Sequence, residues 1–191
     1  MAAISIILPD GSHREYEAGT TLGEAVKQLS NSLAKKVLAA DVDGELTDLR
    51  EELKDGSHVS FLTFEEQGGK DTLRHSASHV MAQAIKRLWP DAKLAIGPAI
   101  ENGFYYDIDM EHVLTPEDLA KIEDAMKKIV KENFPIEKAV MSRDEALKFF
   151  ADKKEDYKVE LIQDLPADAV ISTYKQGEFT DLCAGPHVAS T

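Results

Sequence analysis

Two short motifs contain the residue types from which hydrolytic and metal sites are built. The first is His-Ser-Ala-Ser-His at residues 75–79, and the second is Cys-Ala-Gly-Pro-His at residues 183–187. Imidazole nitrogens and a thiolate can bind Zn²⁺, move protons or orient a water molecule. Three histidines and one cysteine match the ligands of a tetrahedral zinc site in number and type. The two motifs together therefore predict a metal site or a hydrolytic site.

The spacing within each motif allows its side chains to converge. His75 and His79 are four residues apart in a segment predicted to be helical, so both rings lie on one face, about one turn apart. A turn at Gly185-Pro186 can bring the imidazole of His187 back towards the thiol of Cys183. Each pair alone has a simpler explanation, as an ordinary helix face or a small buried thiol. The functional interpretation therefore requires both motifs to line one cavity.

The elements that position these motifs follow from hydrophobic periodicity and from signals at their ends. The sequence predicts helices over 71–88, 115–132 and 142–150, strands over 94–100, 104–108 and 136–141, and further apolar segments over 159–162 and 169–174. From the residues alone, the simpler alternative for Lys158 is a solvent-facing strand residue, which is the usual position of lysine. Because the elements lack a regular βαβ rhythm, an α+β sandwich is expected.

The pattern of the first third of the chain predicts a separate, smaller domain. Strands are expected over 4–8, 13–17, 36–40 and 58–64, with a helix that begins at the capping box of Thr21 and Glu24. The polar, glycine-containing residues 65–70 are typical of a linker. The predicted organisation is a domain over 1–64, a linker over 65–70 and a second domain over 71–191.

Composition limits the classes of function. Hydrophobic residues make up 43% and charged residues 30% of the 191 residues, as in ordinary globular proteins. The net charge of −13 argues against a protein that coats nucleic acid through a broad basic surface, so any contact with RNA must be local. No run approaches the roughly 18 apolar residues of a membrane span, and the opening residues are unlike a signal peptide. We therefore expect a soluble, cytoplasmic protein without membrane partners.

Three stretches of the second domain resemble a known family. Residues 75–79, 96–107 (Ile-Gly-Pro-Ala-Ile-Glu-Asn-Gly-Phe-Tyr-Tyr-Asp) and 181–187 are similar to signature stretches of the editing domain of threonyl-tRNA synthetases. Residues 1–64 resemble the TGS domain, a small ubiquitin-like β-grasp module that precedes this editing domain. Alanyl-type editing domains share the His and Cys-His pairs. The order of modules and the middle stretch distinguish the threonyl type.

The resemblance implies hydrolysis of seryl-tRNA(Thr) made in error, with the aminoacylated 3′ end of tRNA(Thr) as the substrate. It places His75, His79, Cys183 and His187 around the terminal adenosine and its ester. Asp181 would contact the seryl group or position water. Lys158 would support the developing negative charge or the leaving ribose oxygen. Tyr105 or Tyr106 would shape the pocket; neighbouring strand residues face opposite sides, so the sequence does not choose between them.

The resemblance also sets expectations for cofactors and for the full-length protein. Editing is expected to require no metal, with zinc at the His/Cys cluster as the alternative. The ATP and zinc sites belong to an aminoacylation core that this chain lacks, the parent protein is expected to be a homodimer, and the editing domain is expected to continue beyond residue 191. Two rival hypotheses stay open: an alanyl-type, metal-dependent trans-editing deacylase, and a non-enzymatic module that binds RNA or protein.

Overall fold

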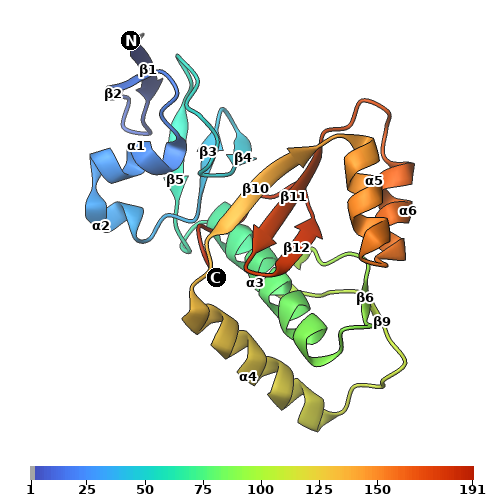
Figure 1. Cartoon of the computed structure of the whole chain (residues 1–191). Helices are drawn as coiled ribbons and strands as arrows, with labels where there is room; N and C mark the ends of the chain where they lie inside the picture. Colours follow the sequence, from blue (N-terminus) through green and yellow to red (C-terminus); the bar gives the residue numbers. More distant parts are fainter. Residues whose placement is uncertain (1–2) are drawn as a thin grey trace. The chain divides into compact units, whose positions relative to one another are not determined.

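The chain forms two compact units in a computed structural model that describes residues 3–191. Met1 and Ala2, the start of the predicted first domain, lie outside the described residues. The first unit comprises the residues up to Leu73 together with Gly185–Ala189, and the second comprises Arg74–Ala184 with Ser190 and Thr191. Both units combine helices with antiparallel strands (Figure 1), which confirms the expected α+β class.

The first unit pairs a hairpin with a three-stranded sheet. Its elements are β1 (Ala3–Ile7), β2 (His13–Glu17), α1 (Leu22–Leu29), α2 (Asn31–Ala34), β3 (Ala39–Val42), β4 (Glu45–Thr47) and β5 (Val59–Leu62). Strands β1 and β2 are antiparallel, and the other sheet has the order β4-β3-β5. A parallel bridge between Ile7 and His58 connects the hairpin to the start of β5. The bridge thereby joins the two sheets of the unit through β1 and β5.

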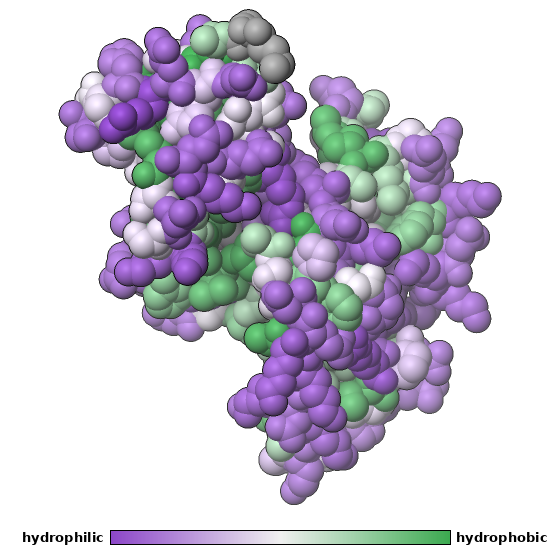
Figure 2. All heavy atoms as spheres, turned by 60° about the vertical axis from the view of Figure 1, so that its left-hand side comes forward, coloured by the Kyte–Doolittle hydropathy of each residue, from purple (hydrophilic) through white to green (hydrophobic). Residues whose placement is uncertain are grey.

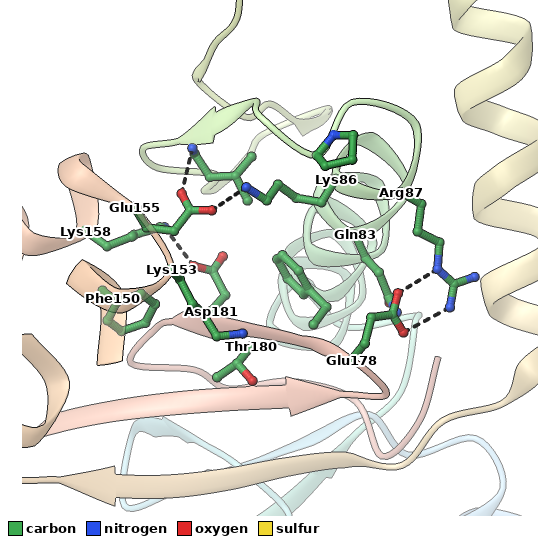
Figure 3. A pocket seen from close by; sticks show the side chains of 13 residues that line it. Gln83, Lys86, Arg87, Phe150, Lys153, Glu155, Lys158, Glu178, Thr180 and Asp181 are labelled. Atoms are coloured by element: carbon green, nitrogen blue, oxygen red, sulfur yellow. Dashed lines mark hydrogen bonds and ion pairs between the residues drawn. The ribbon is translucent and has the colours of Figure 1, made fainter. Parts of the chain in front are cut away.

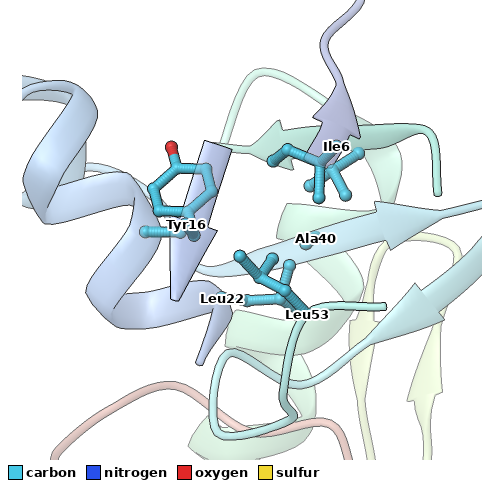
Figure 4. Close-up of a cluster of buried hydrophobic side chains, with 7 residues drawn as sticks. Ile6, Tyr16, Leu22, Ala40 and Leu53 are labelled. Carbon is cyan, nitrogen blue, oxygen red and sulfur yellow. The ribbon is translucent and has the colours of Figure 1, made fainter. Parts of the chain in front are cut away.

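The core of the first unit explains why these short elements fold together. Side chains from both sheets and from α1 are buried against one another in Figure 4, among them Ile6, Tyr16, Leu22, Ala40 and Leu53. The predicted capping box is confirmed, because the Thr21 side chain accepts the Glu24 N–H while the Glu24 carboxylate accepts the Thr21 N–H. This exchange satisfies amides that the first helical turn leaves without partners.

The second unit is built around helix α3. Its elements are α3 (Gln67–Leu88, from Arg74 onward), β6 (Lys93–Leu94), β7 (Ala99–Ile100), β8 (Gly103–Phe104), β9 (Ile108–Asp109), α4 (Pro116–Glu132), β10 (Ile136–Met141), α5 (Arg143–Asp152), α6 (Asp156–Asp164), β11 (Ile171–Gln176) and β12 (Phe179–Leu182). Strands β10, β11 and β12 form an antiparallel sheet in that order.

Helix α3 is buried on more than one side. Its residues Val80 and Ile85 pack in one cluster with Ile122 and Ile129 of α4, while its Ala82 joins a second cluster with Phe179 of β12. A helix surrounded in this way must satisfy any polar side chain internally. The histidines of α3 therefore face partners within the protein.

The predicted linker is partly helical. Helix α3 begins at Gln67, inside the expected linker of 65–70, and the boundary between the units falls within this helix, after Leu73. The Glu66 carboxylate accepts the N–H of Thr63 at 2.7 Å. A Cβ atom on Gly69 would lie only 1.8 Å from the Thr63 carbonyl oxygen. The glycine thus allows close packing of the helix, whereas the sequence pattern indicated flexibility.

Three of the expected segments differ from the structure: one is helical and two expected strands are shorter. Residues 159–162 belong to helix α6, because Ile162 and Val159 pack with Phe150 of α5 in a shared cluster. The expected strands over 94–100 and 104–108 reduce to two-residue ladders, β6 with β9 and β7 with β8. Between the ladders the two segments stay joined by main-chain hydrogen bonds. The Ala95 N–H donates to the Asp107 carbonyl at 2.9 Å, and the Asp107 N–H donates to the Ile96 carbonyl at 2.8 Å.

The surface is mainly polar. Hydrophilic residues predominate on the face shown in Figure 2, and hydrophobic residues form smaller areas between them. Within residues 3–191, none of the helices combines the length and the apolar character that crossing a membrane demands.

Candidate functional site

Helix α3 places the first histidine pair on one face, as its spacing predicts. The rings of His75 and His79 lie 5.1 Å apart between centroids and are perpendicular to each other. His79 is buried and His75 is half-buried. The Ser78 hydroxyl lies 2.7 Å from the His75 carbonyl oxygen and 2.8 Å from that of Gly97. Contact with the 96–98 segment therefore fixes the turn of α3 that carries both rings.

The end of β12 brings Cys183 to this histidine pair. Its Sγ lies 3.2 Å from His75 Nε2, and the ligand atoms of Cys183, His75 and His79 all lie within 4.8 Å of one another. Ser172 of β11 holds Cys183 in place. The Cys183 N–H donates to the Ser172 carbonyl at 3.1 Å, and the Ser172 hydroxyl donates to the Cys183 carbonyl at 2.6 Å. The structure thus brings together one residue of the second motif with both histidines of the first.

His187 lies on the segment 185–189, which belongs to the first unit. It is buried, and its backbone is held from both sides. The His187 N–H donates to the Asp48 carboxylate at 3.2 Å, and Arg50 donates to the carbonyls of His187 at 3.0 Å and Val188 at 2.8 Å. An Asp48–Arg50 ion pair of 2.8 Å completes this arrangement.

A buried network of opposite charges adjoins the histidines. Lys158 Nζ of α6 lies 2.8 Å from Asp181 Oδ1 of β12, and it donates to the Tyr106 hydroxyl oxygen at 2.9 Å and to the Ala95 carbonyl at 2.5 Å. The Tyr106 hydroxyl donates to Asp181 Oδ2 at 2.5 Å. That oxygen lies 3.6 Å from His79 Nε2. The second unit therefore joins an imidazole, a carboxylate, a phenol and an ammonium in one contiguous network.

The structure decides two questions that the sequence left open. Tyr106 is 9% exposed and points into the network, while Tyr105 is 41% exposed and points away from the core. Lys158 is 3% exposed, so its interpretation as a solvent-facing strand residue is wrong. Burying lysine is costly unless it is paired, and Asp181 supplies the opposite charge.

Burial and neighbouring charges set the protonation states in this network. Burial, reinforced by nearby His75 and Lys158, holds the pKa of His79 well below its ordinary value. Burial and the adjacent Asp181 carboxylate raise the pKa of the Tyr106 phenol. Near neutral pH, His79 is therefore an uncharged imidazole, which can accept a proton, and Tyr106 is a hydrogen-bond donor.

The donor atoms fit a metal ion by their chemistry. Two imidazoles and one thiolate are ligands that zinc accepts, and three protein ligands leave the fourth position to water in hydrolytic zinc sites. The 3.2 Å separation of His75 Nε2 and Cys183 Sγ also suits a direct hydrogen bond. The residues thus accommodate either a metal or a metal-free, hydrogen-bonded pair.

Gly97 is a further residue of the site, which the sequence motifs did not identify. A Cβ atom on Gly97 would lie 2.2 Å from the Tyr106 ring, so only glycine lets this ring lie flat enough against the chain to reach Asp181. A glycine inside a strand-like pattern does signal close approach of another group. The sequence contained this signal, but it did not identify the approaching group.

The fold of the first unit and a sequence comparison define its class. Residues 4–63 match the TGS domain family, whose fold is a β-grasp. Over 188 residues, or 98% of the chain, the sequence is 55% identical to the threonine–tRNA ligase of Syntrophomonas wolfei and 56% identical to that of Clostridium novyi. Over 190 residues it is 52% identical to the threonine–tRNA ligase of Symbiobacterium thermophilum.

These matches extend across both units but cover only part of the relatives. The chain spans about 30% of the length of each threonine–tRNA ligase that it matches. The expected similarity to the amino-terminal region of threonyl-tRNA synthetases is confirmed.

Proposed function

We propose that this chain hydrolyses the ester of seryl-tRNA(Thr) in the cytoplasm, as the editing part of a threonine–tRNA ligase. One observation carries the proposal: His75, His79 and Cys183 converge within 4.8 Å beside the buried Lys158–Asp181 pair. The similarity to threonine–tRNA ligases is the basis for naming serine and tRNA(Thr) as the two parts of the substrate. The aminoacylation core, its ATP and zinc sites and a homodimer interface are assigned to the part of those relatives that this chain does not span.

The chemistry of the two amino acids explains why such a ligase needs a second site. Serine is threonine without one methyl group, and a missing methyl in a pocket provides only about 1–3 kcal/mol of discrimination. A pocket built for threonine therefore accepts serine at a harmful frequency. A hydrolytic site that admits serine and sterically rejects threonine removes the error.

Different residues of the second unit can serve different steps of ester hydrolysis. The neutral His79 imidazole accepts a proton from the attacking water, and Asp181, 3.6 Å away, orients it or contacts the seryl group. The Lys158 ammonium supplies a fixed positive charge that stabilises the oxyanion or the leaving ribose oxygen. His75 and Cys183 line the ester site, and Tyr106 holds the Asp181 carboxylate.

We assign His187 to the same site as the fourth residue around the ester. Only Ala184, Gly185 and Pro186 separate it from Cys183 along the chain, and the two residues form the Cys-x-x-x-His pair of the 183–187 motif. Under this assignment, replacing either His187 or His75 slows hydrolysis, while the aminoacyl ester remains the substrate.

Deacylation assays test the proposal. The protein is incubated with seryl-tRNA(Thr), threonyl-tRNA(Thr) and seryl-tRNA(Ala), and His75→Ala serves as the inactive control. We expect rapid loss of serine from tRNA(Thr) only, and a form extended beyond Thr191 is assayed in parallel. Absence of hydrolysis by both forms would overturn the proposal and favour a module that only binds RNA or protein.

The role of zinc is tested in the same assay. We propose that hydrolysis proceeds without a metal, through the hydrogen-bonded His75–Cys183 pair. Activity should then survive incubation with a chelator. Loss of activity on chelation, restoration by zinc and hydrolysis of seryl-tRNA(Ala) would favour the alanyl-type deacylase.

A further inference from the structure

A second ion pair, formed by the buried Glu155 and the half-buried Lys86, lies beside the Lys158–Asp181 pair. The Glu155 carboxylate lies 2.6 Å from Lys86 Nζ of α3, and it accepts the Leu94 N–H of β6 at 3.2 Å. Figure 3 shows Glu155 between Lys86 and Lys158 at the cavity. One carboxylate thus ties together α3, β6 and the start of α6.

Glu155 stands at the position where a helix is normally capped, yet it does not cap α6 with its side chain. Its carbonyl accepts the N–H of Lys158 at 3.0 Å, so its backbone is part of the turn that carries this lysine. Taking a carboxylate and an ammonium out of water costs free energy that their attraction often only balances. Stability alone is therefore a weak reason for this pair.

The pair fixes the main-chain acceptor of Lys158. Leu94, which donates to Glu155, directly precedes Ala95, whose carbonyl accepts a hydrogen bond from Lys158 Nζ. Lys86 Nζ also donates to the Ala92 carbonyl at 2.8 Å, which anchors the same segment from its other end. The Glu155–Lys86 pair thereby holds both the backbone of Lys158 and the carbonyl that accepts a hydrogen bond from its ammonium.

The cavity explains why Lys158 needs such a support. It has a volume of about 470 Å³, and Lys86, Glu155, Lys158 and Asp181 are among the residues that line it. Lys158 lines this cavity, and its ammonium is held by Asp181, Tyr106 and the Ala95 carbonyl. A side chain with four rotatable bonds otherwise has many positions available.

We propose that Glu155 and Lys86 are positioning residues for Lys158. The proposal rests on the hydrolytic function proposed above, in which the ammonium must lie where negative charge develops. A misplaced charge stabilises the transition state less but leaves the binding of tRNA unchanged. Disrupting the pair should therefore lower kcat and leave KM nearly constant.

The test compares matched variants of the full chain with seryl-tRNA(Thr) as substrate. Glu155→Gln keeps the size of the side chain and an acceptor for the Leu94 N–H but removes the charge that holds Lys86. Lys86→Gln removes the other partner, and Lys86→Arg keeps the charge. Displacements of about 1 Å can cost roughly 100-fold in rate, so kcat should fall about 10- to 100-fold in both glutamine variants. KM should change less than about twofold, and Lys86→Arg should retain most of the activity.

Arg87→Gln is the control. Arg87 is next to Lys86 in α3, lines the same cavity and forms two ion pairs of its own, with Glu132 and Glu178. This variant should lose stability but keep its kcat. An unchanged kcat in Glu155→Gln and Lys86→Gln, or an equal loss in Arg87→Gln, would overturn the proposal.

A spectroscopic measurement separates this proposal from the proposed hydrolysis. With ¹⁵N-labelled lysine, the ammonium protons of Lys158 should exchange slowly with water in the wild type. In Glu155→Gln they should exchange faster, and in Arg87→Gln they should stay protected. If the wild type hydrolyses nothing, this result still decides whether Glu155 positions Lys158. Unchanged protection in Glu155→Gln contradicts the positioning role whatever the activity.

Discussion

Lys158 and Asp181 form an ion pair of 2.8 Å in which the two residues are only 3% and 2% exposed. The lysine comes from α6 and the aspartate from β12, so the pair joins two elements that are distant along the chain. It also borders the His75, His79 and Cys183 cluster through the Asp181–His79 contact. Stability and the proposed catalysis therefore depend on the same two charges.

Removing one partner of the Lys158–Asp181 pair should lower the free energy of unfolding. Lys158→Met leaves a buried carboxylate without its counter-ion, and we expect the free energy of unfolding to fall by about 3–5 kcal/mol. In the double variant Lys158→Met with Asp181→Leu neither charge of this pair remains, so the loss should be smaller than the sum of the two single losses. Urea unfolding of the four proteins measures this coupling, and strictly additive losses would refute it.

Gly97→Ala should displace Tyr106. The added Cβ would lie 2.2 Å from the tyrosine ring, which must move and thereby lose its hydrogen bond to Asp181. Overpacking of this kind costs about 1–3 kcal/mol, and hydrolysis of seryl-tRNA(Thr) should fall with it. Gly103→Ala, with no atom within 4 Å of its added Cβ, is the control in the same segment. Comparable unfolding curves for both variants would argue against this role of Gly97.

The sequence predicted the elements whose signals are local. The capping residues Thr21, Thr115 and Ser142 all occupy N-cap positions in the structure, and the strand over 136–141 has the expected bounds. A hydroxyl followed three residues later by a carboxylate satisfies helix amides within one turn. Such an arrangement needs no distant partner, so its outcome can be foreseen from a few residues.

The resemblance placed Lys158 at the site, but the local sequence pattern did not predict its environment. Tyr157, Val159 and Leu161 alternate with polar residues, a period that indicates a strand. Packing of Ile162 against Phe150 of α5 instead stabilises a helix, and the helix turns the lysine inward. Distant contacts decide here, and they also explain why Glu155 was missed, since its partners Lys86 and Leu94 are more than 60 residues away.

From the sequence, the convergence of the two motifs could be stated only as a requirement of the functional interpretation. Spacing alone placed His75 and His79 on one face of a helix. The contact of His75 with Cys183 depends on the sheet register of β11 and β12, which pairs Thr173 with Leu182 and so sets Cys183 beside Ser172. Register is a property of the assembled sheet, and local sequence patterns do not determine it.

Acid should weaken the ion pair between Glu178 and Arg87. Hydrogen bonds from Arg87 lower the pKa of Glu178 from 4.5 to about 2. The folded state therefore binds this proton less readily than the unfolded state, and the stabilisation is complete above about pH 4.5 and lost as the pH falls towards 2. Because Glu178 is largely exposed, the effect should be at most about 1 kcal/mol. Glu178→Gln should show a flatter pH dependence of unfolding than the wild type; identical profiles would contradict the assignment.

Arg50 should control how firmly the segment 185–189 is held in the first unit. Its guanidinium donates to two successive carbonyls, those of His187 and Val188, and hydrogen bonds from charged donors contribute about 1.5–3 kcal/mol. In Arg50→Ala, hydrogen exchange of the His187 amide should therefore accelerate about 10- to 100-fold, since each 1.4 kcal/mol is a factor of ten. Arg50→Lys should restore only part of the protection, because an ammonium lacks the planar fork that reaches both carbonyls.

Arg143→Ala is the matched control for Arg50→Ala. Arg143 also donates to main-chain carbonyls, those of Ile162, Leu165 and Pro166, but it does so within the second unit. Its replacement should speed exchange near the end of α6 and leave the His187 amide unchanged. If both alanine variants expose the His187 amide equally, the protection comes from global stability; if neither does, Asp48 alone is sufficient to hold the segment. Only a selective loss in Arg50→Ala supports a direct role for the guanidinium in placing the segment that carries His187.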